Sequence, residues 1–174
     1  MEWYESIFEL IDFRSFSNLW YWIGLAVMWS SSAHWVMGIP FDMVTQARRK
    51  GGPAMEDLQD IARVNITRIL EIVRIAGPWL VALVLFVITT LAISGFVYGA
   101  EFAQALFCMG FPMMFVGYLN YATARRIRRE KARGEHLCRA ILRCRVYVQL
   151  IGTVSIFFTA LWGMYSNISA SVLG

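Results

Sequence analysis

Four long stretches of this sequence contain no Asp, Glu, Lys or Arg, and they limit the folds that the chain can adopt. The stretches lie between Arg14 and Asp42, between Arg74 and Glu101, between Glu101 and Arg125, and from Val146 to Gly174. Each is longer than the roughly 20 apolar residues that are needed to cross about 30 Å of hydrocarbon. The helices of a soluble bundle need charged faces, and these stretches have none. The sequence therefore predicts an all-α membrane protein.

The residues at the edges of these stretches set the expected spans. Tryptophan and tyrosine side chains prefer the level of the lipid headgroups, and they mark the edges of the stretches. Pro40 ends the first helix, because proline cannot continue a helix interior. Pro78 predicts a bend where the second span begins. We expect a single domain over residues 1–174, with four transmembrane helices at about residues 18–37, 78–98, 102–121 and 146–165.

The distribution of basic residues predicts the orientation of these spans. Fifteen of the sixteen Lys and Arg residues lie in two segments, residues 39–76 and 122–145, and Arg14 is the exception. Cytoplasmic loops carry an excess of Lys and Arg, so we expect both segments in the cytoplasm and both termini on the opposite side. Residues 3–16 are expected to form a short amphipathic helix that lies in the membrane interface.

The two basic segments are expected to form amphipathic helical extensions of the spans. In the first segment, Leu58, Ile61, Ile69 and Ile72 recur at helical spacing, and charged residues occupy the other faces. We expect this apolar stripe to lie on the membrane surface; the second basic segment and a partner protein are the alternative surfaces. In the second segment, the third span is expected to continue as a helix through the arginines towards Gly134.

The arginines themselves are the strongest candidates for a binding surface. Residues 124–145 hold nine of the sixteen Lys and Arg residues. Basic residues beside a span commonly bind anionic lipid headgroups, and arginine favours bidentate contacts with phosphate and carboxylate groups. No aromatic residues that could stack on bases interleave the arginines, so we expect no binding of nucleic acid. The candidate residues for anionic lipid or a protein partner are Arg48, Arg49, Lys50, Arg125, Arg126, Arg128, Arg129, Lys131, Arg133, Arg139, Arg143 and Arg145.

A few residues within the spans are candidates for helix contacts or for a cofactor. Serines in a span can bond to a neighbouring helix, and a GxxxG spacing allows close approach of two helices. The candidate helix-contact residues are Ser30, Ser31, Ser32, Gly95 and Gly99, and Gly99 also suits a turn.

His34 is an ionisable residue inside a span and a candidate haem ligand. The alternative is a neutral histidine that bonds to a serine hydroxyl. The other histidine, His136, lies in a basic segment, so we expect no haem site with two histidines from one chain.

The remaining motifs predict neither an enzyme nor a bound metal. His136, Cys138 and Cys144 do not have the ligand spacing of a structural zinc site. The chain has no Walker, GxSxG, HExxH or GxGxxG motif. No Asp or Glu lies deep in a span, which argues against an ion-coupled transporter. We therefore expect a non-enzymatic scaffold or accessory subunit of a membrane complex without cofactors, which docks its partners through the Arg-rich cytoplasmic loops or through the aromatic-rich spans. A small oligomeric transporter or channel, and a haem-binding redox protein that uses His34, are the alternatives.

The segment from Phe8 to Val44 resembles a family of alphaproteobacterial membrane proteins. The likeness is strongest in RSFSNLWYWI, residues 14–23, and the pattern of four spans with basic loops also fits. Members of that family are often labelled as a component of the SufBCD complex, the scaffold that assembles iron–sulfur clusters. The resemblance implies a bacterial inner-membrane location and a partnership with that assembly machinery. With the basic segments in the cytoplasm, both termini are then expected in the periplasm. It supplies no catalytic residues.

Overall fold

The structure, a computed structural model, describes Phe16 and residues 18–172, and about 91% of this part is helical. The expected interfacial helix at residues 3–16 lies outside the described residues, except for Phe16. The elements in chain order are α2 (Leu19–His34), β1 (Trp35–Val36), β2 (Ile39–Pro40), α3 (Phe41–Lys50), α4 (Gly52–Ala92), the π-helix η2 (Ile93–Val97), α5 (Glu101–Glu130) and α6 (Gly134–Val172). The predicted helical fold is confirmed in this part of the chain.

Three of the described helices are long and apolar enough to cross a membrane. They are Gly52–Val97, Glu101–Glu130 and Gly134–Ser169, and they contain the second, third and fourth expected spans. Each helix is longer than its expected span, because the adjoining basic segment continues the same helix. The helix α5 runs through the arginines to Glu130. Lys131 then ends it in the left-handed conformation, with a φ of 49°.

The helix at the first expected span ends earlier than predicted. It ends at His34 instead of Met37, because the backbone turns back on itself at Met37 and Gly38, whose φ angles are 54° and 72°. This turn pairs β1 with β2 as an antiparallel hairpin. The helix α2 therefore has 16 residues, and its length is about 24 Å at 1.5 Å per residue.

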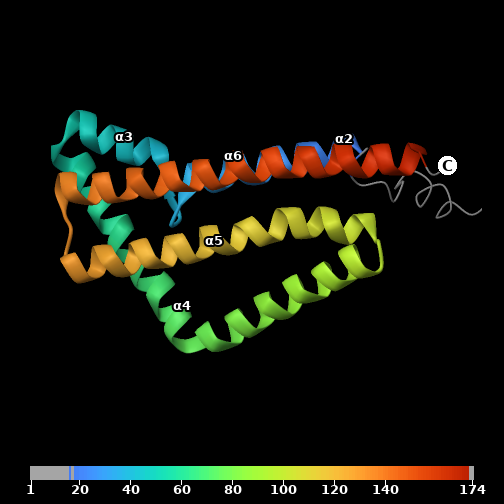
Figure 1. The fold of residues 1–174 in the computed structure, drawn as a ribbon. Coiled ribbons are helices and arrows are strands. Elements are labelled where there is room, and N and C mark those ends of the chain that lie inside the picture. The colour runs from blue at the N-terminus through green and yellow to red at the C-terminus, as the bar shows by residue number, and fades with distance from the viewer. Residues whose placement is uncertain (1–15, 17, 173–174) are drawn as a thin grey trace, which may run out of the picture.

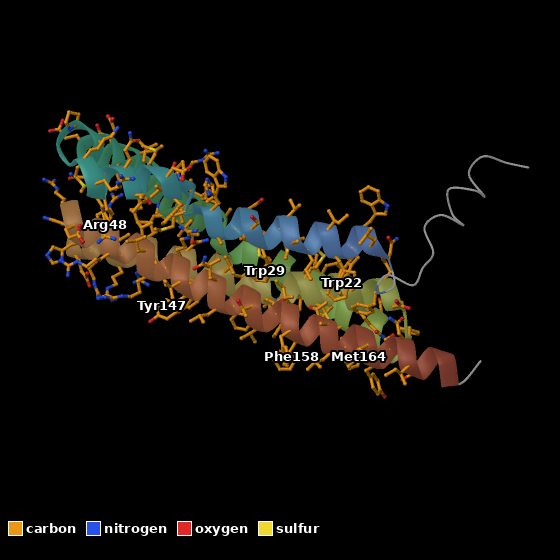
Figure 2. All side chains as sticks on the ribbon, turned by 90° about the horizontal axis from the view of Figure 1, so that it is seen from above. Trp22, Trp29, Arg48, Tyr147, Phe158 and Met164 are labelled. Carbon is orange, nitrogen blue, oxygen red and sulfur yellow. The ribbon has the colours of Figure 1, made fainter. Side chains whose placement is uncertain are left out.

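Most of the helical segments run lengthwise through the molecule, and the basic segments meet at one end (Figure 1). Figure 1 shows α5, α6 and the second half of α4 running lengthwise, with α3 and the first half of α4 at the same end as the α5–α6 turn. In Figure 2, α2 lies beside α6. The helix α4 bends sharply in the part drawn in green in Figure 1, and Pro78 lies inside this helix.

A hydrophobic cluster, which we call the helix-end core, holds the basic end of the molecule together. Leu58 is completely buried in it, and Ile61 and Ile69 pack against it, so the expected position of the stripe on the membrane surface is wrong for these three residues. Ile72, at the end of the stripe, is 46% exposed. The helix-end core consists of Val36, Met37, Ile39, Val44, Ala47, Leu58, Ala62, Ile66, Ala124, Ile127, Leu137, Cys138, Ile141 and Cys144.

A smaller cluster joins α2 to α5 and α6 near the middle of the helices. It consists of Leu25, Trp29, Val116 and Val148. The ring of Trp29 fits against the backbone of Gly152 so closely that a Cβ atom at Gly152 would lie 2.7 Å from Trp29 Cε3. Figure 2 shows Trp22 and Trp29 between α2 and α6. A glycine at residue 152 is therefore what allows these two helices to pack together.

The rest of the helical surface is strongly apolar. In the most apolar window of α4, only 6% of the residues are buried, and Trp79 and Phe86 are largely exposed. Figure 2 shows Phe158 and Met164 on the side of α6 that faces away from α2. Exposed apolar surface on this scale indicates contact with lipid or with another membrane protein.

Candidate binding surface at the basic end

The twelve basic residues predicted to bind lipid or a partner all belong to the end of the molecule that surrounds the helix-end core. They occupy the C-terminal turns of α3 and α5, the α5–α6 turn and the first turns of α6. Figure 2 shows the nitrogen atoms of long side chains gathered at this end, around Arg48. The two parts of this surface are joined directly, because Arg48 Nε at the end of α3 lies 3.7 Å from Glu135 Oε1 at the start of α6.

Arg145 has a packing role that the sequence did not reveal. Its guanidinium carbon lies 3.3 Å from the centre of the Phe41 ring, and its Nε atom is buried. A cation over an aromatic face is stabilised by the negative charge of the ring face. This contact ties α6 to the first residue of α3, so the charged group of Arg145 is engaged within the chain.

Four other arginines are engaged in bonds on the surface. Arg126 Nε lies 2.9 Å from Glu130 Oε1, and Arg128 Nη1 donates a hydrogen bond of 3.0 Å to Thr67 Oγ1 on α4. Arg48 and Arg139 share the Glu135 carboxylate, and the Nε atom of each lies 3.7 Å from Oε1. Exposed ion pairs of this kind each stabilise a protein by only about 0–1 kcal/mol, so these side chains remain available to a stronger acidic ligand.

The side chains of the other seven basic residues are exposed and form no hydrogen bond or ion pair with another described residue. They are Arg49, Lys50, Arg125, Arg129, Lys131, Arg133 and Arg143. Five of these surround the two turns at the extreme end of the molecule, and we call them the basic tip: Arg49, Lys50, Arg129, Lys131 and Arg133. Acidic residues are close to this tip in the sequence, with Glu56 and Asp57 in the first turns of α4 and Glu130 and Glu135 beside the α5–α6 turn.

Two grooves separate the helices at this end. The α4–α5–α6 groove has a volume of about 650 Å³, and Asp60, Arg63, Thr67, Arg128 and Lys131 are among its lining residues. The α5–α6 groove has a volume of about 300 Å³, and its lining includes Arg126, His136, Arg139, Arg143 and Tyr147. The sequence could not reveal either groove, because each depends on how two or three helices are rotated about their axes.

The candidate helix-contact serines differ in their surroundings. Ser32 Oγ donates a hydrogen bond of 2.8 Å to the carbonyl of Met28 and lies 3.7 Å from Met113 Sδ on α5. Ser30 and Ser31 are exposed. Of the three, Ser32 is therefore the one that the structure places against a neighbouring helix.

The two glycines of the GxxxG spacing also have different surroundings. A Cβ atom at Gly95 would lie 2.9 Å from the backbone nitrogen of Gln104, so Gly95 allows the π-helix and α5 to approach closely. Gly99 has open space around it and a φ of 71°, as a turn residue does.

Gln104 is a contact residue that the sequence reasoning missed. Its Nε2 atom donates to the Gly95 carbonyl at 2.8 Å, and its Oε1 atom accepts from Trp162 Nε1 at 3.0 Å. One amide side chain therefore links η2, α5 and α6 at the end of the molecule opposite the basic tip. The signal for this role in the sequence is an amide side chain inside an otherwise apolar stretch.

The candidate cofactor ligand His34 lies at the C-terminal end of α2. Its Nε2 atom is 3.9 Å from Asp42 Oδ2, its side chain is 41% exposed, and its ring meets Trp35 edge to face. His136 lies elsewhere, in the α5–α6 groove. Within residues 18–172, no group of three or more His, Cys, Asp or Glu side chains is placed to hold a metal ion.

The cysteines of the second basic segment serve the packing of the helix-end core. Cys138 and Cys144 are buried there. Cys138 Sγ lies 4.0 Å from Met55 Sδ on α4, and Cys144 Sγ lies 3.6 Å from Asn120 Oδ1 on α5. Both thiols thus contact neighbouring helices from the interior, which is a common position for a free cysteine.

Comparison with known proteins adds no assignment to this surface. No protein-family model matches the chain, and no curated protein and no solved structure is significantly similar to it.

Proposed function

We propose that this protein is a non-enzymatic scaffold or accessory subunit of a membrane complex, and that its basic tip binds an acidic surface of a partner protein. The observation that carries this proposal is the concentration of five exposed, unpaired cations around two adjoining turns. Three of the five are arginines, whose planar guanidinium groups form bidentate contacts with carboxylates. Charge of one sign also speeds the encounter with a partner of opposite sign.

The helix-end core supports this proposal because it fixes the positions of the two turns. The turn after α3 and the turn after α5 are attached to helices that bury Ala47, Leu58, Ile127 and Leu137 against one another. A surface that is already ordered loses less conformational entropy on binding than a flexible loop does. The basic tip is therefore better suited to docking than an unstructured run of arginines of the same composition.

We further propose four spans in the bacterial inner membrane, with the basic end in the cytoplasm and both termini in the periplasm. The position of α2 supports its assignment as a span in addition to the three long helices. The helix α2 lies alongside α6 and shares the cluster of Leu25, Trp29 and Val148 with it. Most of its outward side chains are apolar, with Leu19, Ile23 and Val27 exposed, and Ser30 and Ser31 are the polar exceptions. The distribution of Lys and Arg supports the orientation.

Labelling of single cysteines in intact cells tests this topology. We expect a membrane-impermeant maleimide to label Leu19→Cys and Ser169→Cys from outside, and to label Lys50→Cys only after the inner membrane is made permeable. The background is Cys108→Ala, because Cys138 and Cys144 are buried. If Leu19→Cys shares the labelling behaviour of Lys50→Cys, α2 does not cross the membrane and the chain has three spans.

The partner is best sought by purification from native membranes in mild detergent, followed by mass spectrometry. We expect a stoichiometric protein partner that is retained by the wild type and lost from a tip variant, Arg129→Gln with Lys131→Asn and Arg133→Gln. Asparagine is chosen for residue 131 because it tolerates the left-handed backbone found there. The resemblance at Phe8–Val44 makes the SufBCD complex the first partner to look for.

A matched control separates docking from a general loss of charge. Arg63→Gln with Arg68→Gln and Arg74→Gln removes the same number of charges from α4, outside the basic tip, and we expect it to retain the partner. Equal loss from both variants would contradict specific docking at the tip. Recovery of the protein as a homo-oligomer without any other protein would overturn the scaffold proposal and favour a small transporter or channel.

A further inference from the structure

The α5–α6 groove has a pattern of side chains that the proposed docking at the tip does not use. On α6, His136, Arg139, Arg143 and Tyr147 recur at intervals of three or four residues, so they lie along one face of the helix. The facing residues of α5 follow the same spacing, and they are Leu119, Thr123, Arg126 and Glu130. The groove is therefore formed by two matching helix faces that run side by side.

The character of this groove changes along the helices from charged to apolar. Its charged part is nearer the α5–α6 turn, where Arg126, Arg139 and His136 lie. Its other end is lined by Leu119, Ala122 and Tyr147, which belong to the charge-free stretches of the sequence. The groove therefore crosses the expected membrane edge, where tyrosine side chains prefer to lie.

The cations of this groove are only partly neutralised within the chain. Three guanidinium groups line the groove together with one carboxylate, that of Glu130, which is 2.9 Å from Arg126. Arg139 has only a long contact of 3.7 Å with Glu135, a carboxylate that it shares with Arg48. The side chain of Arg143 is exposed and forms no hydrogen bond or ion pair with another described residue. The groove therefore has an excess of positive charge at the level of the headgroups.

We infer that the α5–α6 groove binds the headgroup phosphate of an anionic phospholipid. Arg139 and Arg143 supply the guanidinium donors for the phosphate oxygens, and arginine suits this geometry. After Tyr147 along α6, the apolar side chains of Leu150 and Val154 are exposed, and the acyl chains of the lipid can follow them into the bilayer. A basic pocket between helices on the cytoplasmic side is the kind of site that holds such headgroups. This inference does not depend on the identity of any protein partner.

Native mass spectrometry of the delipidated full-length protein tests this site. The probes are phosphatidylglycerol and phosphatidylcholine with identical acyl chains, which differ in headgroup charge. We expect phosphatidylglycerol to bind at least 10-fold more tightly. Arg139→Gln with Arg143→Gln should weaken that binding about 10-fold or more, because each basic residue near the surface contributes ~1 kcal/mol to lipid binding. Phosphatidylcholine binding should change little.

Further variants keep the test decisive. Arg143→Gln alone removes an exposed side chain without an internal bond, so it remains informative if the double variant does not fold. Arg139→Lys with Arg143→Lys should restore part of the affinity, because the charge is kept but the bidentate geometry is lost. Arg68→Gln with Arg74→Gln removes two charges from α4 and should leave phosphatidylglycerol binding unchanged.

Several outcomes would overturn the inference. Equal weakening by the α4 control variant would show that the lipid responds to total charge and not to this groove. Displacement of the lipid by inorganic phosphate, with comparable affinity, would identify a site for free phosphate instead. Loss of a co-purified protein from the groove variant, with its affinity for phosphatidylglycerol intact, would make the groove a protein-docking site.

Discussion

Replacing Leu58 with alanine is expected to lower the free energy of unfolding by about 2–5 kcal/mol. Leu58 is completely buried at the centre of the helix-end core, where α4 meets the other basic helix ends. Removing its isopropyl group loses apolar contacts and leaves a cavity, because the surrounding helices can only partly close the space. The loss of stability can be measured by denaturant titration in mild detergent, with circular dichroism as the signal.

Val64→Ala is the matched control, since Val64 lies in the same helix and is 60% exposed. A change at such a surface position is expected to remain within about 0.5 kcal/mol. If the first half of α4 were held only by the lipid surface, the two variants would have the same stability in detergent. Similar values for Leu58→Ala and Val64→Ala would therefore show that the helix-end core does not hold this end of the protein together.

Replacing Gly152 with leucine is expected to destabilise the packing of α2 on α6 by about 1–3 kcal/mol or more. Even a Cβ atom at this residue would lie 2.7 Å from the ring of Trp29, which is buried between the helices. Leucine is the better helix former by about 1 kcal/mol. The steric term is the larger one, because a whole side chain must displace the Trp29 ring. Thermal unfolding in mild detergent measures the result.

Gly24→Leu is the corresponding control on α2, because no other group lies within 4 Å of a Cβ atom at Gly24. We expect this change to be neutral or slightly stabilising, in line with helix propensity. A second check combines Gly152→Leu with Trp29→Ala, which should be more stable than the sum of the two single losses predicts. Strict additivity of the two changes would show that Trp29 and residue 152 do not collide.

The sequence was sufficient for the features that depend on local composition. Charge-free stretches predicted the three long apolar helices, since hydrophobicity over about 20 residues is a local property of the chain. The run of basic residues after Tyr121 predicted the basic end and a helix that continues through the arginines towards Gly134, and α5 does continue through most of them, to Glu130. These features need no knowledge of which helices are neighbours.

The features that depend on helix neighbours could not be predicted in this way. The spacing of Leu58 and Ile61 showed an apolar stripe, but only the structure shows that another helix covers it. Arg145 looks like its basic neighbours in the sequence, yet it lies over the ring of Phe41, which is remote along the chain. The hairpin after His34 depends on two left-handed residues, Met37 and Gly38, that have no strong local signal besides the glycine.

The uneven burial of α4 has a consequence for how freely its sequence can change over evolutionary time. Its membrane half presents apolar side chains outward, so one apolar residue can replace another there without disturbing a neighbour. Its first half places Leu58, Ala62 and Ile66 against other helices, where all three are buried. We therefore expect selection to restrict residues in the charged half of this helix more strongly than in the hydrophobic half.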